Sequence, residues 1–370
     1  MSIRVLFAAG GTGGHIFPAI AVYEELLLRY GSALQVHWLG SANRMESTMI
    51  PKYGIPYTAM PIQGFRSLMS LDTALLPFRV ASSVMKARSC MRTFKPDVVV
   101  VTGAYISYPA GIAAKQLSIP YVVMESNVNI GKTNRQLIPH AAGVILSYEE
   151  SQAQLPTHAL ARSHVLGNPV RSCVKQTITS GEAREMFGLH TDTPTLFAVG
   201  GSLGARSINL AMQGMLFELA DETQAPFQII WQTGKNFQAH VPDSLKGAVA
   251  ALEFVDDVGA AYQAADVVIA RSGATTLAEL GVIGKPAILV PLPSASMGEQ
   301  QLNANAAERR GAATVIADEN LATELMMTVQ NLMNNETQRR TMSQRMLAMG
   351  RPDAASKTVD VIEALVGGIR

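Results

Sequence analysis

Disulfide chemistry, strong net charge and long apolar runs are all missing from this chain. It has only two cysteines in 370 residues, Cys90 and Cys173, so we expect a reducing compartment. The 30 Lys and Arg residues offset 29 Asp and Glu residues to a net charge of +1, whereas nucleic-acid binding would need a marked basic excess. No apolar run reaches the roughly 18 residues of a membrane-spanning helix, and residues 1–4 show no secretory signal.

Metal-binding motifs are also scarce. The seven histidines are scattered, no Cys-x-x-Cys motif occurs, and no Asp-x-Asp motif is present to carry a divalent ion to a nucleotide sugar. We therefore expect neither a protein-bound metal nor a cofactor.

Short β-branched segments alternate with helical patterns, which is typical of parallel sheets with crossover helices. The length and the hydrophobic content of 48% suit two domains better than one core. We predict an α/β protein with two doubly wound Rossmann-like domains facing a central cleft. Residues 1–166 form the first domain, with a C-terminal helix in 353–370 packing back on it, and residues 167–352 form the second. The predicted strands are Ile3 to Ala8, Gln35 to Leu39, Asp97 to Val101, Tyr121 to Met124, Gly143 to Leu146, Thr195 to Val199, Gln228 to Trp231, Glu253 to Val255, Val267 to Ala270 and Ala287 to Val290.

A glycine-rich motif, Gly10-Gly11-Thr12-Gly13-Gly14-His15, follows the first predicted strand and precedes an amphipathic helix. Glycines at a helix N-terminus favour an anionic ligand such as phosphate, although such a turn also occurs simply to close a tight connection. The dinucleotide fingerprint would need glycine where Ile16 stands, and no Lys-Ser or Lys-Thr follows as in nucleotide hydrolases. The motif therefore indicates phosphate rather than a redox cofactor or ATP.

A second glycine motif, residues 200–204, follows the strand that opens the second half of the chain. Its Ser202 suits a diphosphate ligand or, alternatively, a helix N-cap. Two such turns indicate two phosphorylated ligands.

Polar side chains also follow other predicted strands, in residues 103–107, 125–129, 271–279 and 300–303. The carboxyl ends of parallel strands meet at one edge of a sheet, and amides and carboxylates there suit sugar or ribose hydroxyls. Each segment taken singly also fits an ordinary turn. In the third segment, Glu279 falls in the first turns of a helix, where a carboxylate can accept both hydroxyls of a ribose.

Residues 65–95 interleave apolar side chains with six basic ones and a single acid, Asp72. Such a segment suits a protein resting on an anionic membrane leaflet, or a helix that simply covers the sheet.

Taken together, the motifs resemble those of the MurG family of bacterial UDP-N-acetylglucosamine transferases. They are GGTGGHIFPA, GAYISYPAG, ESNVNIGKTN, GNPVR, GGSLGA, ARSGATTLAELGVIGKPAILVP and EQQLNANAAERRGAA, in this order from residue 3 to near the C-terminus. The resemblance implies the two-domain GT-B architecture and an inverting transfer of N-acetylglucosamine from UDP to the 4-hydroxyl of undecaprenyl-diphospho-N-acetylmuramyl-pentapeptide (lipid I). It also implies a peripheral location at the cytoplasmic face of the membrane and a role in peptidoglycan synthesis.

Carried over by position, the resemblance implies that the first domain binds the acceptor and the second the UDP-sugar. It places His15 next to the reacting groups. We assign the catalytic base to His15, with Glu125 as the second candidate catalytic residue. Val255 would contact uracil through its backbone, and Gln300 would bind hydroxyls of the transferred sugar. The remaining implied contacts to the UDP-sugar are Thr12, Gly13, Gly14, Asn127, Arg171, Ser202, Ala274, Thr275, Thr276, Leu277, Ala278 and Glu279.

The chain departs from the family at two places. Met124 and Ser126 stand where the family usually has a histidine and a glutamine, so any base role of that histidine falls to His15 or Glu125. The segment before Gln300 is one residue longer, which makes Gln301 an alternative, although the spacing to Asn303 favours Gln300.

Two other functions fit the same pattern. A non-hydrolysing UDP-N-acetylglucosamine 2-epimerase shares the architecture and the nucleotide, and a catalytically silent protein of the cell-wall machinery would bind the lipid diphosphate without transfer.

Overall fold

The computed structural model describes residues 2–62, 76–175, 177–201, 204–221, 226–295 and 298–368. The chain forms two compact units. Unit 1 comprises Met1–Arg171 and Arg351–Arg370, and unit 2 comprises Ser172–Gly350. The divisions between the units lie within a few residues of the boundaries expected at 166 and 353.

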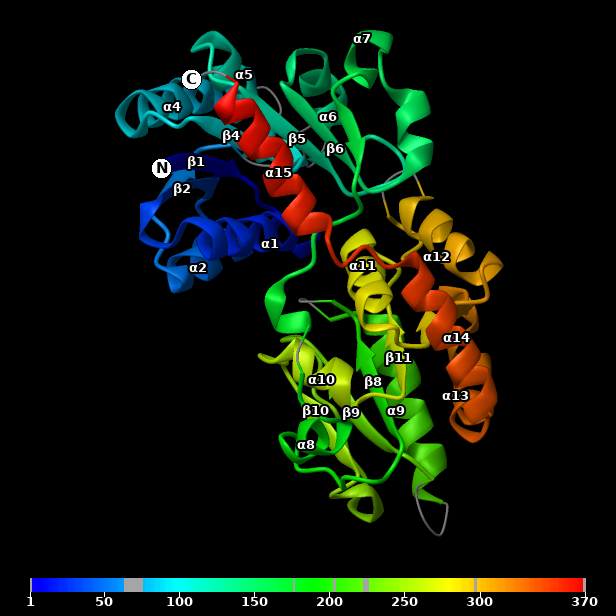
Figure 1. Ribbon diagram of the computed structural model, residues 1–370. Coiled ribbons are helices and arrows are strands. Elements are labelled where there is room, and N and C mark those ends of the chain that lie inside the picture. Colours follow the sequence, from blue (N-terminus) through cyan, green and yellow to red (C-terminus); the bar gives the residue numbers. More distant parts are fainter. Residues whose placement is uncertain are drawn as a thin grey trace. The chain divides into compact units, whose positions relative to one another are not determined.

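Unit 1 contains one parallel seven-stranded sheet in the order β3-β2-β1-β4-β5-β6-β7 (Figure 1). Val5 of β1 pairs with Val36 on one side and Val98 on the other. The chain order reverses about β1, as in doubly wound sheets, which confirms the predicted fold class for this unit. The strands are β1 (Ile3–Ala8), β2 (Leu34–Ser41), β3 (Tyr57–Met60), β4 (Val98–Val101), β5 (Tyr121–Glu125), β6 (Gly143–Leu146) and β7 (Ser163–Val165).

Alternation along β1 builds a separate core on each face of this sheet. Leu6 and Ala8 pack with α4, α5 and α6, whereas Val5 and Phe7 pack with α1 and α15. Both faces are covered, so a central strand such as β4 (Val98–Val101) is continuously apolar. The helices of unit 1 are α1 (Gly13–Tyr30), α2 (Met45–Met49), α4 (Leu76–Phe94), α5 (Ala104–Gln116), α6 (Lys132–Leu137), α7 (Thr157–Leu160) and α15 (Ala354–Gly367).

The C-terminal helix α15 crosses the sheet of unit 1 and packs against α1 (Figure 1). Val359 and Ile362 are buried against the sheet. Arg29, near the end of α1, donates to Asp360 at 2.7 Å and to Glu363 at 2.9 Å. Apolar contacts with the sheet and ion pairs with Arg29 therefore hold the C-terminal helix on unit 1.

Unit 2 contains a parallel six-stranded sheet in the order β10-β9-β8-β11-β12-β13. Helices α9 and α13 cover one face through a large apolar core, and on the other face Tyr262 of α10 packs edge-on against Phe197 of β8. The strands are β8 (Thr195–Val199), β9 (Gln228–Gln232), β10 (Val249–Leu252), β11 (Val267–Ala270), β12 (Ala287–Leu289) and β13 (Ala313–Val315). The helices are α8 (Ser180–Glu185), α9 (Arg206–Ala220), α10 (Val258–Ala264), α11 (Ala274–Ile283), α12 (Glu299–Arg309), α13 (Leu321–Asn334) and α14 (Glu336–Met349).

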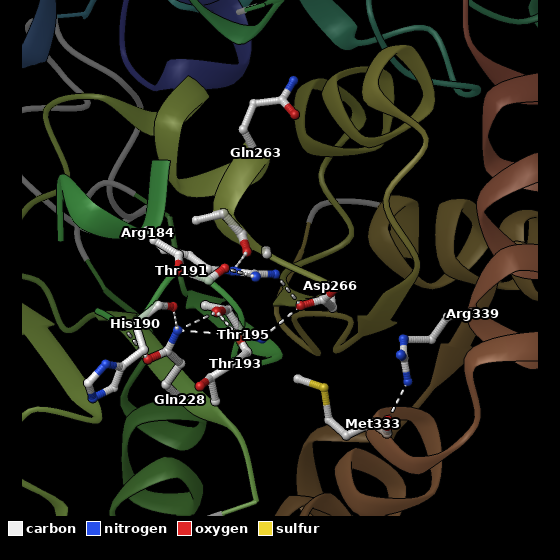
Figure 2. A network of polar contacts seen from close by, with 12 residues as sticks. Arg184, His190, Thr191, Thr193, Thr195, Gln228, Gln263, Asp266, Met333 and Arg339 are labelled. Carbon is white, nitrogen blue, oxygen red and sulfur yellow. Dashed lines mark hydrogen bonds and ion pairs between the residues drawn. The ribbon is translucent and has the colours of Figure 1, made fainter. Parts of the chain in front are cut away.

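A polar network joins the amino ends of the unit 2 strands (Figure 2). Asp266 accepts from Arg184 Nη2 at 2.8 Å and from the N–H of Thr195 at 2.7 Å. Gln228 binds both the N–H and the carbonyl oxygen of His190. Lys285 donates to two carbonyl oxygens nearby, and burial lowers its pKa. These contacts hold the edge of the sheet opposite to the predicted ligand side.

One predicted strand is wrong. The residues from Glu253 to Val255 follow β10 as an irregular segment, and the strand itself is Val249–Leu252. The pattern misleads because Val255 is buried at 3% exposure by loop packing rather than by pairing in the sheet. The strands β3, β7 and β13 are not predicted, because they are edge strands that are only partly buried and so lack the unbroken apolar pattern of the central strands.

Candidate active site

The predicted residues of unit 1 gather at the carboxyl edge of its sheet, where β1, β4 and β5 end. The first glycine motif follows β1 directly, and α1 begins inside it at Gly13, with exposed Thr12 as the N-cap residue. Gly11 has φ +92°, a conformation that side chains rarely adopt. The N-terminus of an 18-residue helix, whose dipole favours negative charge, therefore lies at this edge.

Nothing in the sequence pattern singles out Glu46, which is fully buried beneath the glycine motif. Its Oε2 accepts from the N–H of Gly11 at 3.1 Å, and its Oε1 accepts from Ser41 N–H at 2.9 Å and Ser41 Oγ at 2.5 Å. Gly10 leaves no room for a Cβ beside this carboxylate. Burial, with the nearby Glu46 charge, raises the pKa of Tyr57. The Gly11 N–H therefore stabilises the conformation of the glycine motif and is not directed to a ligand.

The His15 ring is hydrogen-bonded to the end of β4. Its Nδ1 lies 2.7 Å from the carbonyl oxygen of Thr102. A carbonyl oxygen only accepts, so Nδ1 carries the hydrogen and the lone pair of the neutral ring is on Nε2. This tautomer is the one in which Nε2 can take a proton from a substrate hydroxyl.

Gly103 makes room for that ring. It has φ +96° and ψ −155°, and a Cβ there would lie 3.1 Å from His15 Cε1 and 3.3 Å from Asn134 Nδ2. The following Ala104 has φ +55°, which is strained for a residue with a side chain. Ser107 Oγ lies within hydrogen-bonding distance of the carbonyl oxygens of Gly103 and Ala8. The turn after β4 is therefore held in a costly shape beside His15.

Glu125, at the end of β5, has both carboxylate oxygens engaged. Its Oε1 accepts from the N–H of Asn127 at 3.0 Å, and its Oε2 accepts from Gly131 N–H and Asn134 Nδ2 at 2.9 Å. The side chain is only 3% exposed. Met124 points the other way, into the apolar core beside α1 and α15. The Glu125 carboxylate thus organises the loop from residue 125 to α6.

Arg171 lies near the first turn of α1. Its guanidinium carbon is 3.8 Å from the centre of the Phe17 ring, close enough for a cation–π contact. Phe17 also packs against Gly13, where a Cβ would be 2.7 Å from the ring. Nearby, Ser126 Oγ donates to Asn168 Oδ1 at 3.1 Å. Arg171 is thus positioned by unit 1, although it lies beyond the predicted first domain.

In unit 2 the second glycine motif is packed tightly on β9. Gly201 and Gly204 have positive φ, and neither Gly200 nor Gly204 has room for a Cβ, the latter because of the Thr233 carbonyl group. Helix α9 begins at Arg206 with Ala205 as N-cap, so Ser202 is not the N-cap residue of this helix. Ser202 itself lies outside the described residues.

Val255 is joined to this motif through Gln232, the last residue of β9. The N–H of Val255 donates to Gln232 Oε1 at 2.9 Å, and Gln232 Nε2 donates to the carbonyl oxygen of Gly201 at 2.9 Å. The Gln232 side chain is 5% exposed. No sequence pattern indicates this residue, because only the fold brings its two partners together.

The residues from Ala274 to Glu279 form the first half of α11, and Glu279 is 5% exposed. One Glu279 oxygen accepts from Tyr262 Oη at 3.0 Å. Gln300, in the first turn of α12, accepts from the N–H of Leu292 at 3.0 Å through its side chain. Gln301 instead donates to Asn305 on its own helix. Of the two glutamines, Gln300 is the one directed to the loop after β12.

Arg271, at the end of β11, binds three neighbouring segments. It forms an ion pair with Asp318 at 2.5 Å, donates to Ser207 Oγ at 2.8 Å, and reaches the carbonyl oxygens of Val290 and Pro291. Its charge is therefore matched by a carboxylate within unit 2. Among the residues that the structure describes, no three His, Cys, Asp or Glu side chains are grouped to hold a metal ion.

Two family models match the chain. Residues 5–146 match the glycosyltransferase family 28 N-terminal domain, and residues 195–358 match the glycosyltransferase family 28 C-terminal domain. A Cytophaga hutchinsonii protein is 33% identical over 364 residues, which cover 98% of this chain and 97% of the relative. That relative is named a UDP-N-acetylglucosamine–N-acetylmuramyl-(pentapeptide) pyrophosphoryl-undecaprenol N-acetylglucosamine transferase.

Solved structures give the same result for the fold. Acinetobacter baumannii MurG superposes with a TM-score of 0.72 at 27% identity, covering 98% of this chain and 99% of that one. A Listeria monocytogenes protein assigned as a UDP-N-acetylglucosamine 2-epimerase superposes with a TM-score of 0.69, covering 98% of this chain and 96% of that one. Its identity is only 16%, so this second likeness concerns the fold alone. Both units belong to the two-domain GT-B architecture.

Proposed function

The chain belongs to the family of UDP-N-acetylglucosamine–N-acetylmuramyl-(pentapeptide) pyrophosphoryl-undecaprenol N-acetylglucosamine transferases, and from this premise we propose the reaction and the residue roles that follow. The chain is a hexosyltransferase that moves N-acetylglucosamine from UDP to lipid I, which completes the lipid-linked subunit of peptidoglycan. Unit 1 takes the acceptor, and unit 2 takes the UDP-sugar.

The reaction is a single displacement at the anomeric carbon. The acceptor 4-hydroxyl attacks that carbon, a base takes the hydroxyl proton, and the bond to UDP breaks with its electron pair leaving on the diphosphate. The configuration at the anomeric carbon inverts. The protein must therefore supply a base and stabilise the negative charge that develops on UDP.

The observation that carries the base assignment is the 2.7 Å contact between His15 Nδ1 and the Thr102 carbonyl oxygen. It sets the tautomer that leaves Nε2 as the proton acceptor. Glu125 is not available as the base, because its two carboxylate oxygens accept from the N–H groups of Asn127 and Gly131 and from the side-chain amide of Asn134. We therefore give proton transfer to His15 and positioning of the loop to Glu125.

The test is a transfer assay with UDP-N-acetylglucosamine and a short-chain lipid I analogue. His15→Asn retains an N–H near the Nδ1 position, so it can still bind the Thr102 carbonyl oxygen, but it has no basic nitrogen. We expect kcat to fall by about 10²–10⁴-fold with little change in the KM of the UDP-sugar. Full turnover by His15→Asn would refute the base assignment.

Glu279 is the proposed ligand of the ribose hydroxyls. Its carboxylate, in the second turn of α11, is buried and held by Tyr262, and the N-terminus of the same helix favours the diphosphate. Glu279→Gln keeps the volume and removes the charge, so we expect a higher KM for UDP-N-acetylglucosamine and an unchanged KM for the acceptor. An unchanged KM for the UDP-sugar would contradict the ribose role.

Assays with and without the acceptor lipid distinguish the transferase from the two alternative functions. An epimerase would convert UDP-N-acetylglucosamine to its manno isomer with no lipid present, and the family membership favours the transferase over this reaction. A silent lipid-diphosphate binder would release no UDP when both substrates are supplied.

The finer localisation, at the cytoplasmic face of the membrane, is also proposed. In the described part of the chain no helix is both long and apolar enough to cross a bilayer. Helix α4 exposes Phe78 at 74% and Met85 at 63%, and Lys86 and Arg92 are also exposed on it. This combination suits an anionic lipid surface. The rest of the basic apolar segment, residues 65–75, lies outside the described residues.

Cosedimentation with vesicles containing anionic lipid tests this proposal. The Phe78→Ser/Met85→Ser variant should bind such vesicles more weakly than the wild type. Leu210→Ser, which changes a 52% exposed residue in unit 2, is the control that should bind normally. Equal binding by all three proteins would refute the role of α4.

A further inference from the structure

Gln232 connects two segments that the proposed function gives to opposite ends of UDP. Its amide donates to the carbonyl oxygen of Gly201 in the second glycine motif and accepts from the N–H of Val255 in the uracil segment, each at 2.9 Å. The side chain is 5% exposed. One planar group therefore sets the distance between the diphosphate loop and the nucleobase segment.

The fold around Gln232 has its own anchors. The N–H of Thr233 donates to the carbonyl oxygen of Leu252, the N–H of Gly234 donates to that of Glu253, and Asn209 Nδ2 binds the Thr233 carbonyl oxygen. These bonds hold the end of β9 to its neighbours without help from the Gln232 side chain. Its two bonds are thus additional, and both go to loops at the ligand edge.

We propose that Gln232 is a positioning residue for the UDP-sugar, which holds the diphosphate loop and the uracil segment in their bound arrangement before the nucleotide arrives. This inference rests on the proposed function, because that function assigns the loop of Gly201 to the diphosphate and Val255 to the uracil of UDP. Loops that are ordered in advance cost less conformational entropy on binding, so the effect of Gln232 falls on donor affinity.

A neutral amide suits this place better than a charged group. A carboxylate at residue 232 would still accept from the N–H of Val255, but it would face the Gly201 carbonyl oxygen without a hydrogen to donate. It would also set a negative charge beneath a loop that is to receive a diphosphate. Gln232→Glu should therefore weaken binding of UDP more than binding of uridine, which lacks the phosphates.

Gln228 provides a matched control on the same strand. It is also a glutamine, is 1% exposed, and uses its amide to bind His190 and Thr193 at the amino end of β9 (Figure 2). Gln228→Met removes four side-chain hydrogen bonds, against two for Gln232→Met, but it removes them at the edge of the sheet opposite to the ligand side. It should lower the melting temperature and leave nucleotide affinity unchanged.

The experiment is calorimetric titration of UDP and uridine into the full-length wild type, Gln232→Met, Gln232→Glu and Gln228→Met, with KM values measured for both substrates. Loss of two neutral hydrogen bonds predicts roughly tenfold weaker UDP binding by Gln232→Met. The KM of the acceptor lipid should not change. Gln232→Glu should raise the ratio of the UDP to the uridine dissociation constant.

Three results would overturn the inference. Gln232→Met binding UDP as tightly as the wild type would remove the positioning role. Equal loss of UDP affinity in Gln232→Met and Gln228→Met would show a general loss of stability instead. A wild type that bound no UDP would refute the proposed function itself, and this inference with it.

Discussion

Gly103→Ala tests whether the turn after β4 exists to place His15. Gly103 has φ +96° and ψ −155°, a region that is essentially restricted to glycine, so alanine there should cost about 1–3 kcal/mol of unfolding free energy. The added Cβ would also lie 3.1 Å from His15 Cε1 and 3.2 Å from Nδ1, closer than most side chains approach. The ring must shift, and its 2.7 Å bond to the Thr102 carbonyl oxygen must weaken.

Displacement of a catalytic group by about 1 Å costs on the order of 100-fold in rate. The added Cβ asks the His15 ring to move by only a few tenths of an ångström, so we expect kcat for transfer to the lipid I analogue to fall by less, roughly 3–10-fold, while the KM of UDP-N-acetylglucosamine stays the same. Urea unfolding followed by circular dichroism measures the stability change, and the activity assay is run where the variant is fully folded.

Gly54→Ala is the control for backbone strain. Gly54 belongs to the same unit and has φ +69°, but nothing lies within 4 Å of the position that its Cβ would take. Its substitution should cost about 1–2 kcal/mol of stability without loss of kcat. If folded Gly103→Ala were as active as Gly54→Ala, the placement of His15 by this turn would be refuted.

Three further changes test other parts of the structure. Glu46→Gln should lower kcat and cost about 1–3 kcal/mol, because an amide N–H would face a donor at Gly11 or Ser41; unaltered kcat and urea unfolding would contradict this. Asp266→Asn should cost about 2 kcal/mol in urea unfolding by leaving buried Arg184 without its carboxylate, and wild-type stability would contradict that ion pair's role. Burial lowers the pKa of His37, so the unfolded chain binds its proton first as the pH falls below about 6.5, and stability should fall there. His37→Gln should show a smaller loss of unfolding free energy between pH 7.5 and pH 5.5, and an identical loss would exclude His37 as a cause.

Most strands of the two sheets could be predicted from the sequence, because helices cover both faces of a doubly wound sheet. Strands such as β4 and β6 then read as unbroken apolar runs, and glycine motifs mark where β1 and β8 end. The edge strands are short and only partly buried, so their sequences carry little periodicity. The segment from Glu253 to Val255 shows the limit, because burial against a loop and burial in a sheet leave the same apolar pattern.

The predicted site contains the residues whose types indicate sugar and phosphate chemistry, such as His15 and Glu279. It does not contain Glu46 or Gln232, which lie far along the chain from the glycine motifs that they hold. A single glutamate or glutamine in sequence has many uses, and only its partners in the fold distinguish them. The same holds for Glu125, whose two oxygens prove to be bound to its own loop.

The order of strands, helices and glycine turns was determined by local sequence, because backbone conformation and apolar periodicity act over a few residues. The tautomer of His15, the buried carboxylate under Gly11 and the amide that joins Gly201 to Val255 were decided by tertiary structure. A hydrogen bond between distant segments forms only when the fold brings donor and acceptor to about 3 Å, and a short stretch of sequence does not include both partners.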